Sequence, residues 1–315
     1  MLEGAANRTL AAQSEKKNSI DFALWKKADP SHLMQWNSPW GKGYPGWHIE
    51  CTVMSQKYLG DNFDIHGGGL ENAFPHHECE IAQAEAHTDK AFANYWLHNN
   101  MVTINGQKMG KSLGNGIFCH ELFSGDNFQL DRAYSPMTIR FFILQSHYRS
   151  TLDFSNTALE AASKGLNRLQ NGILKLETLT PSEKSSIDIH EFKSKLYSAM
   201  DDDFNSPIVI AHLFDGLKLA NAIESSKESL NEKDLNEFKA LFHTFYFAIL
   251  GLEIEEKQSS EDGVVDELMK LVLDFRLAAK TQKDYATADQ IRDRLRDLNI
   301  TVKDGKDGAE WSFEK

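Results

Sequence analysis

The segment FPHHECE places two histidines, a cysteine and two glutamates directly around a proline. If a helix begins at Pro75, His76 and Glu80 are four residues apart, so their side chains share one face. An imidazole and a carboxylate at that spacing can reach one zinc ion, which also accepts thiolate. Either Cys51 or Cys79 could supply the sulfur, and the pattern does not choose between them. The acids could instead simply complement the positive end of the helix.

A second candidate group lies in GQKMGKSLGN, where Lys108 and Lys111 stand on a glycine-flanked loop. Two ammonium groups there can neutralise the charge that develops in a phosphoryl or nucleotidyl transition state. The spacing is not that of a P-loop. The three glycines of IHGGGLEN would let the backbone approach a ligand, often a nucleotide. A solvated basic loop and a plain chain reversal are the alternatives for these two motifs.

The elements that must position these residues follow from local patterns. NFDIHGGG predicts a short strand that runs into a glycine turn, and PHHECEIAQAEAH predicts a helix with proline in its first turn. YWLHNNMVTINGQKMGKS predicts a strand, a turn at Asn-Gly and a basic loop. From about residue 137 the apolar residues recur at helical spacing. TPSEKSSIDIH and EIEEKQSSEDGV have the composition of linkers, and the last long helix should break near Lys283 and Asp284 before a turn-rich tail.

Bulk properties limit the function classes. At 315 residues the chain should hold two or three domains, if a domain takes roughly 100–200 residues. The 41% hydrophobic content is that of a globular protein, and no apolar run approaches the ~20 residues that span a bilayer. Three cysteines do not make a disulfide framework, which favours a reduced, cytoplasmic setting without membrane contact. A net charge of −12 argues against generic binding to a polyanion but is compatible with nucleic acid recognised by a local basic patch.

Taken together, the motifs resemble a known family. KMGKS resembles the KMSKS signature of class I aminoacyl-tRNA synthetases, with glycine replacing the middle serine. GWHIEC, FDIHGGG, FPHHECEIAQ and MDDDFNSP, in this order, closely resemble bacterial cysteinyl-tRNA synthetases, and ADQIRDRL…GAEW looks like the C-terminal end of that family. The resemblance covers nearly the whole chain. It implies ATP-dependent ligation of cysteine to tRNA(Cys), with Mg²⁺ accompanying ATP, by a monomer.

The resemblance also implies the roles of particular residues. Zinc would be held by Cys51, His76 and Glu80, and it would select the substrate thiolate over the hydroxyl of serine. Lys108 and Lys111 would stabilise the departing pyrophosphate. The pocket for cysteine would be formed by Trp47, His48 and His66. Contacts with ATP would come from Gly68, Glu71 and Lys111. Glu71 stands where the family usually has an aspartate that holds the ribose.

The expected architecture is α/β followed by all-α, namely the second half of a class I Rossmann-type catalytic domain and helical anticodon-binding domains. Residues 1–150 would be the catalytic part, 151–255 a helical linker and DALR-like domain, and 262–315 a small anticodon-binding domain. In the last of these, Asp289 and Asp304 would contact base edges, with Trp311 near the docked loop. Residues 271–300 hold six basic and five acidic side chains, so phosphate contacts there should be few.

Two alternatives remain at this stage. No HIGH motif precedes GAANRTL, so the chain should correspond to the C-terminal two-thirds of the enzyme, without the first Rossmann half and its fourth zinc ligand, a cysteine. It could then be a non-catalytic tRNA-binding fragment. The mycothiol-pathway ligase shares the zinc site and signature loop, but its family lacks the long helical end, so it ranks lower.

Overall fold

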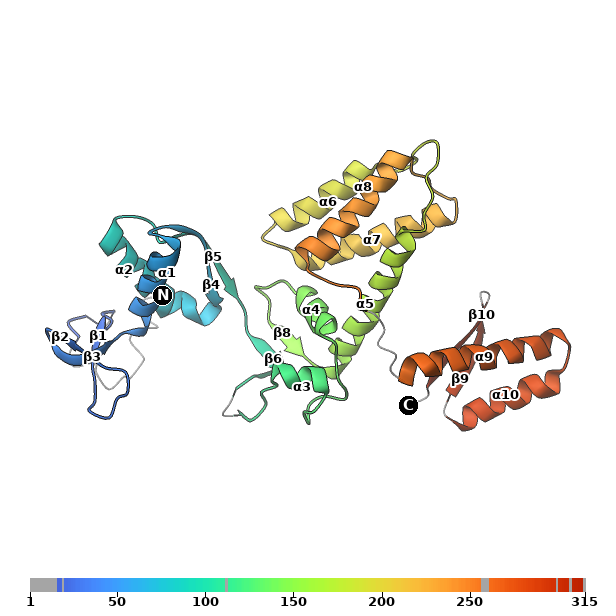
Figure 1. Cartoon of the computed structure of the whole chain (residues 1–315), viewed down its shortest axis with the longest axis horizontal. Coiled ribbons are helices and arrows are strands. Elements are labelled where there is room, and N and C mark those ends of the chain that lie inside the picture. Colours follow the sequence, from blue (N-terminus) through green and yellow to red (C-terminus); the bar gives the residue numbers. More distant parts are fainter. Residues whose placement is uncertain are drawn as a thin grey trace. The chain divides into compact units, whose positions relative to one another are not determined.

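The computed structural model describes residues 16–18, 20–110, 113–255, 261–298, 300–305 and 308–313. The chain divides into two compact units, residues 1–252 and 253–315. Figure 1 shows that strands are concentrated in the first half of the chain and helices in the second. The expected α/β-then-helical fold class is confirmed. Among the described residues, no helix is both long and apolar enough to cross a membrane.

The first unit opens with a small antiparallel sheet, in which β3 (Gly41–Pro45) pairs with both β1 (Trp25–Lys27) and β2 (Trp36–Ser38). Helix α1 (Trp47–Leu59) follows β3 after one residue, Gly46. A Cβ at Gly46 would overlap the backbone carbonyl of Ala23, so only glycine allows this close entry into α1.

The next layer is a parallel strand pair flanked by helices. Strand β4 (Phe63–Gly69) pairs with β5 (Ala93–Asn99), and α2 (Glu78–Thr88) forms the crossover between them. The predicted strand FDIH is therefore confirmed, but the glycines continue the strand instead of turning, because they pair with residues 97–99 of β5. Helix α1 packs on α2, which brings the GWHIEC and FPHHECE motifs together.

The helix of the FPHHECE motif is built from two consecutive segments. A separate helical turn, Ala73–His77, precedes α2, and Phe74 inside it has an extended backbone with φ −140° and ψ 132°. His76 ends up one turn before Glu80 all the same, because residues 75–80 have helical geometry. The predicted proximity of these two side chains is therefore confirmed.

A second sheet carries the lysine loop. Strand β6 (Val102–Ile104) pairs with β7 (Gln107–Lys108) in a hairpin and with β8 (Leu152–Phe154) in parallel. The predicted Asn-Gly turn is confirmed, since Asn105 and Gly106 have φ values of 49° and 76°. Short helices α3 (Cys119–Ser124) and α4 (Pro136–Leu144) follow the loop.

The rest of the first unit is helical, as the periodicity predicts. Helix α4 packs on α5 (Asn156–Leu176), and α5 packs in turn on α7 (Ser206–Glu224). Helices α6 (Ile189–Asp201) and α8 (Glu232–Phe242) complete the bundle, which a helical turn, His243–Ile249, extends. Side chains of α5–α8 such as Leu166, Leu213 and Phe238 are at most 1% exposed and form its core.

The second unit contains α9 (Glu261–Thr281), α10 (Tyr285–Asp297) and a hairpin of β9 (Ile300–Gly305) and β10 (Gly308–Phe313). The break between the helices lies at residues 282–284, as predicted. The tail, expected to be only turn-rich, forms a regular antiparallel pair instead. Among its described residues, Met269, Leu295 and Ile300 form a small buried cluster, with Trp311 packed against it.

Candidate metal and substrate site

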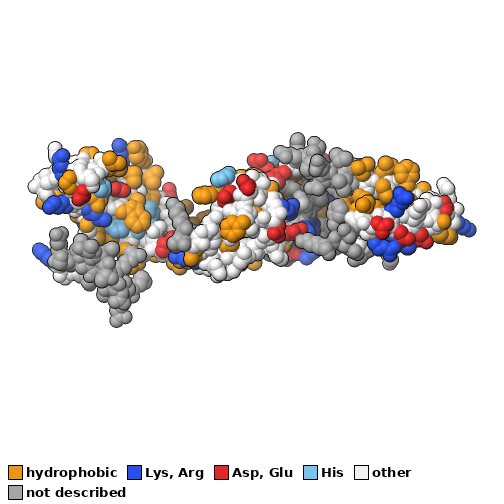
Figure 2. Space-filling model, turned by 90° about the horizontal axis from the view of Figure 1, so that it is seen from below, with side chains coloured by type: hydrophobic (Ala, Val, Ile, Leu, Met, Phe, Trp, Pro, Cys, Tyr) orange, Lys and Arg blue, Asp and Glu red, His pale blue; other side chains and the backbone are white. Residues whose placement is uncertain are grey.

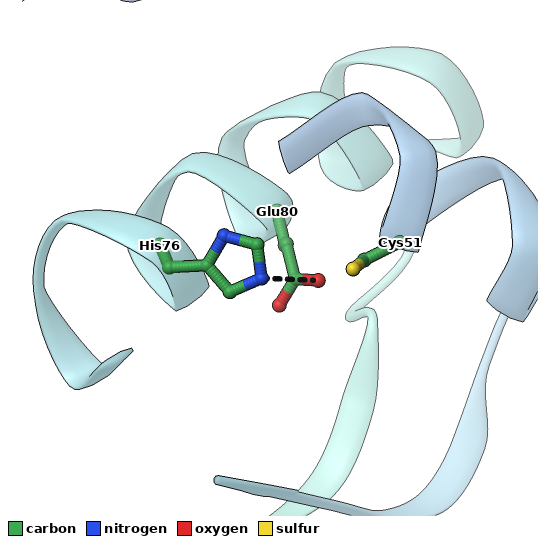
Figure 3. A group of neighbouring side chains, drawn as sticks. All are labelled: Cys51, His76 and Glu80. Carbon is green, nitrogen blue, oxygen red and sulfur yellow. Dashed lines mark ion pairs between the residues drawn. The ribbon is translucent and has the colours of Figure 1, made fainter. Parts of the chain in front are cut away.

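Three predicted ligands converge between α1 and α2. Cys51 comes from α1, His76 from the helical turn before α2, and Glu80 from the first turn of α2. One ligand atom from each lies within 4.8 Å of those of the other two. Figure 3 shows the Cys51 sulfur and the His76 ring on either side of the Glu80 carboxylate, with the dashed line marking the His76–Glu80 pair. The described set of sulfur, nitrogen and oxygen donors is one that zinc accepts.

Glu80 is the centre of this arrangement. It is fully buried, and neither of its carboxylate oxygens accepts a hydrogen bond. Oε1 lies 3.5 Å from His76 Nε2, and Oε2 lies 3.0 Å from His66 Nε2. A buried carboxylate without hydrogen bonds is costly unless a cation or proton compensates its charge. The orphaned oxygens therefore fit a metal ion.

The histidines around Glu80 orient one another. His48 Nδ1 lies 2.6 Å from His76 Nδ1, so one of the two rings donates a hydrogen bond to the other. This contact occupies the far nitrogen of His76 and leaves its Nε2 facing Glu80. Such an outer hydrogen bond commonly fixes the tautomer and orientation of a ligating histidine. His48 thus lies behind a candidate ligand.

Aromatic rings line the site. The Trp47 ring stacks on His76 with centroids 4.1 Å apart, yet 58% of its surface is exposed. The Trp96 ring meets His66 edge-on at 4.8 Å. Figure 2 shows pale-blue histidine side chains beside orange hydrophobic ones on the part of the molecule that holds α1 and α2. Trp47, His48 and His66, the predicted substrate contacts, are thereby brought next to the three candidate ligands.

The thiols of the site differ in position. Burial, followed by the negative charge of Glu80, raises the pKa of the Cys51 thiol. Burial raises the pKa of Cys79 to about 11, and Cys79 belongs to neither cluster of potential ligands among the described residues. A metal ion would deprotonate a thiol that reaches it. Cys51 is the cysteine placed to respond.

A second cluster was not anticipated from the sequence. His66, His77 and Glu80 also bring their ligand atoms within 4.8 Å, and they share Glu80 with the first cluster. His77 Nδ1 lies 2.8 Å from His98 Nε2, and burial lowers the His77 pKa to about 4, so this ring is neutral at physiological pH. Trp96 and His98 are two residues apart on β5, so they face the same side of the sheet, and His66 pairs with Trp96 from β4. This period of two is the sequence signal that could have indicated the second cluster.

The glycine motif has a local structural role here. A Cβ at Gly68 would lie 2.8 Å from the His77 ring, so glycine leaves room for the buried histidine. A Cβ at Gly69 would overlap the Glu71 carboxylate, which folds back over that residue. Glu71 itself is exposed.

The lysine loop is closed by a residue that the sequence reasoning missed. Asn115, 9% exposed, donates from Nδ2 to the Lys108 carbonyl (3.0 Å) and accepts at Oδ1 from the Gly110 amide (2.9 Å). Gln129 Nε2 in turn donates to the Asn115 carbonyl. Lys108 is exposed on β7, whereas Lys111 lies outside the described residues. Asn115 directly follows Gly114 in the KSLGN segment, and an asparagine beside a glycine in a loop could have been recognised as a residue that closes the loop through its side chain.

The predicted anticodon contacts lie in the second unit. Asp289 is exposed on α10, and its Oδ1 is 3.0 Å from Arg292. Trp311 is half-buried against the core of the unit and pairs across the hairpin with Val302. Asp304 belongs to β9, and its side chain lies outside the described part of the structure.

Comparisons with known proteins agree with this order of motifs. A family model for the "tRNA synthetases class I (C) catalytic domain" matches residues 3–164, just over half of the chain. A DALR domain model matches residues 195–255, and a model of the "Cysteinyl-tRNA ligase anticodon binding domain" matches residues 269–311.

Curated relatives match almost the entire chain. A protein of Bacteroides fragilis named cysteine–tRNA ligase is 54% identical over 311 residues, which are 98% of this chain and 63% of that protein. A protein with the same name from Cytophaga hutchinsonii is 48% identical over 321 residues, 99% of this chain and 64% of its own length. The chain thus spans somewhat less than two-thirds of the relatives that it matches. Because the catalytic-domain model covers more than half of its residues, the chain belongs to the class I (C) tRNA synthetase family.

Proposed function

We propose that this chain takes part in the ATP-dependent ligation of cysteine to tRNA(Cys), as a cytoplasmic monomer, with zinc selecting the amino acid. The observation that carries the proposal is the convergence of Cys51, His76 and Glu80 around a fully buried carboxylate with two orphaned oxygens. The names of the curated relatives support the same reaction.

Zinc binding and cysteine selection would involve different residues of the site. Cys51, His76 and Glu80 would hold the zinc ion, with His48 orienting His76 through the ring contact at 2.6 Å. When bound, zinc is a Lewis acid that favours a thiolate over a hydroxyl group. Trp47 and His66 flank the trio and would contact the cysteine substrate. Discrimination of cysteine from serine and alanine would then need no second, editing site.

The chemical step would use ATP with Mg²⁺. The carboxylate of cysteine attacks the α-phosphorus, which releases pyrophosphate and leaves a cysteinyl adenylate, and a hydroxyl of the terminal adenosine of the tRNA then displaces AMP. Lys108 and Lys111 would neutralise the charge on the departing pyrophosphate. Gly68 and Glu71 would lie against ATP, with Glu71 toward its ribose. Asn115 keeps the end of the loop that bears Lys108 closed.

Cysteine-dependent exchange between ATP and pyrophosphate tests the proposal. We would assay the chain alone and mixed in a 1:1 ratio with the portion of the Bacteroides fragilis relative that it does not match. Exchange is expected with cysteine and not with serine. The Cys51→Ala variant should lose this exchange, and it should also no longer bind one zinc ion per chain. Exchange that proceeds equally with serine would contradict the assigned selectivity.

A binding-only role is the second candidate, because the chain spans only 63% of the Bacteroides fragilis relative. The same assay separates the two functions. A chain that binds tRNA(Cys) but supports no exchange, either alone or in the 1:1 mixture, would be a tRNA-binding protein and not a ligase.

A further inference from the structure

The MDDDFNSP motif forms the corner between α6, which ends at Asp201, and α7, which begins at Ser206. Two consecutive residues of this corner, Asp203 and Phe204, have left-handed backbones with φ values of 55° and 56°. That conformation is costly for residues other than glycine, above all for a bulky aromatic one. Such strain persists only where the surrounding contacts determine the geometry. Contacts made by the corner must therefore offset this cost.

The Asp203 carboxylate binds the loop of residues 147–150, which precedes β8. Tyr148 Oη donates a hydrogen bond to Asp203 Oδ1 at 2.6 Å, and Arg149 Nε lies 2.6 Å from Asp203 Oδ2. Arg149 Nε also donates to Tyr148 Oη (3.1 Å), so the three side chains form a closed triangle. The hydrogen bond from Tyr148 lowers the pKa of the Asp203 carboxyl, which is therefore ionised at neutral pH. Both oxygens of one carboxylate are thus occupied by the same loop.

A second contact attaches the corner to the same part of the chain. Ser206, 9% exposed, donates from Oγ to the carbonyl of Leu144, the last residue of α4 (2.8 Å). An exposed ion pair alone contributes little to stability. Here the ion pair of Asp203 is joined to a tyrosine hydroxyl, and a buried serine binds the same segment five residues earlier. The corner therefore holds residues 144–149 at both ends.

The segment held by the corner in turn binds the chain where β6 begins. Asn100, between β5 and β6, donates from its backbone amide to the Tyr148 carbonyl (2.9 Å) and from Nδ2 to the Arg149 carbonyl (3.0 Å). At the start of β8, the Leu152 amide donates to the Met101 carbonyl (3.1 Å). Strand β6 pairs with β7, which leads into the lysine loop. A continuous series of contacts thus runs from the α6–α7 corner to the sheet that carries this loop.

We propose that Asp203 is a positioning residue for the lysine loop: by binding Tyr148 and Arg149, it fixes Asn100 and the sheet of β6, β7 and β8 to the helical bundle. The role rests on the proposed function in that Lys108 acts on the departing pyrophosphate. Asp203 touches no reacting group itself and acts only through the loop that it holds. The candidate cysteine pocket lies on other elements, namely α1, α2 and β4. Loss of the Asp203 contacts should therefore affect the step that uses the lysines and leave cysteine binding unchanged.

Neighbouring aspartates of the motif supply a matched pair of variants. Asp203→Asn removes the charge but keeps the size of the side chain, and asparagine tolerates a left-handed backbone. Asp201→Asn makes the same change at an exposed aspartate at the end of α6. Hydrogen exchange of the intact chain would be followed by mass spectrometry in peptides from β6–β7, α2 and α7. Exchange in β6–β7 should be about three- to tenfold faster in Asp203→Asn, whereas Asp201→Asn should stay within about twofold of the wild type.

The reaction supplies a measurement that a purely structural role would not change selectively. In the 1:1 mixture with the unmatched portion of the Bacteroides fragilis relative, Asp203→Asn should lower the maximal rate of pyrophosphate exchange at least about fivefold. The cysteine concentration that gives the half-maximal rate should be unchanged. Tyr148→Phe should reproduce both effects. The double variant should be no worse than the more severe single variant, because the two side chains act through one contact.

Other outcomes would overturn the positioning role. Unchanged hydrogen exchange of β6–β7 in Asp203→Asn would do so and leave the proposed ligase function intact. Exchange that becomes faster by the same factor in α2 and α7 would also do so, because the corner would then stabilise the fold as a whole. A higher cysteine requirement at an unchanged maximal rate would place the effect at the cysteine pocket instead. If the wild-type mixture shows no pyrophosphate exchange, the proposed function fails, and hydrogen exchange still decides whether Asp203 holds the sheet.

Discussion

Glu80 is the residue on which the candidate site depends. A fully buried carboxylate that accepts no hydrogen bond lowers the stability of a metal-free protein, because desolvation of its charge is not offset. The flanking histidines, at 3.0 and 3.5 Å, offset this cost only in part, through their ring N–H groups. A cation at this position would remove the deficit, so metal binding and folding of this region should be coupled.

Replacement of the charge should expose this coupling. Glu80→Gln keeps the volume of the side chain but removes the anionic ligand, so zinc affinity should fall by at least the roughly 10–100-fold that loss of an outer-shell partner costs. Zinc per chain would be measured by mass spectrometry of the metal after dialysis against a chelator series. The matched control is Glu78→Gln, an exposed glutamate in the same helical turn, which should retain zinc. Equal zinc content in both variants would remove Glu80 from the ligand set.

Asn115 gives a second prediction at this scale. Asn115→Ala deletes both hydrogen bonds that hold Lys108 and Gly110 together, at a cost of about 1–3 kcal/mol. The loop should open more often, so trypsin should cleave after Lys108 several-fold faster. The exposed Asn167, replaced by alanine, is the control and should leave that cleavage unchanged. A cleavage rate at Lys108 equal to that of the wild type would show that other contacts close the loop.

At the scale of elements, two glycines in long helices should differ in their tolerance of alanine. A Cβ at Gly216 in α7 would lie 2.7 Å from the rings of both Phe192 and Phe242, whereas one at Gly165 in α5 would lie 3.2 Å from Phe141. Alanine gains ~0.8–1 kcal/mol of helix propensity, but overpacking costs ~1–3 kcal/mol. Gly216→Ala should therefore lower the free energy of unfolding by up to about 2 kcal/mol, while Gly165→Ala stays within about 1 kcal/mol of the wild type. Urea unfolding measures both, and equal values would contradict the close contact at Gly216.

The hairpin that precedes the lysine loop should be sensitive to acid. Asp153 Oδ1 accepts hydrogen bonds from Thr103 Oγ1 (2.6 Å) and the Gly106 amide (2.7 Å), and these bonds lower the Asp153 pKa. Since the folded-state pKa is below the unfolded one, the stabilisation is present above the unfolded value of about 3.9 and is lost as pH falls through the folded value. Asp153→Asn should be less stable than wild type at pH 6, and the difference in urea midpoint should shrink below pH 4. A difference that is constant with pH would show that charge is not involved.

Prediction from sequence succeeded where a local rule decides the structure. The Asn-Gly turn, the break near Lys283 and the helices after residue 137 each follow from backbone preference or apolar spacing. It failed where a distant strand decides. The glycines of β4 look like a turn locally, but pairing with β5 extends the strand, and the tail forms a hairpin because β10 packs Trp311 on the core of α9 and α10.

The same division applies to the candidate site. The i, i+4 spacing predicts that His76 lies near Glu80, and family resemblance adds Cys51 from another helix. Neither could indicate that His48 faces the back of His76, because that contact joins residues 28 apart in the chain. The layer of His77, His98 and Trp96 likewise depends on the parallel register of β4 and β5. Sequence spacing carries no information on such pairs.

At the scale of the whole molecule, the division at residue 252 predicts two independent stabilities. The large buried apolar side chains described in the second unit form one small cluster around Met269, Leu295 and Ile300, and domains near 60 residues are marginal. In hydrogen exchange at increasing urea, peptides from α9 and α10 should lose protection before those from α7 and α8. Leu295→Ala should accelerate exchange in the second unit only. Loss of protection in α7 as well would mean that the two units fold as one.

The closure of the lysine loop by Asn115 also affects how the stored protein ages. Asparagine followed by glycine is prone to lose ammonia, because the next amide nitrogen can attack the side-chain carbonyl, and Asn115 is followed by Gly116. While both ends of the Asn115 amide are hydrogen-bonded, its side chain cannot rotate toward that nitrogen. Deamidation at this position then requires the loop to open, and each product chain carries a carboxylate that can no longer donate to the Lys108 carbonyl. The combined yield of aspartate and isoaspartate at residue 115 would therefore report how often the loop opens, and ligands that keep the loop closed should lower that yield.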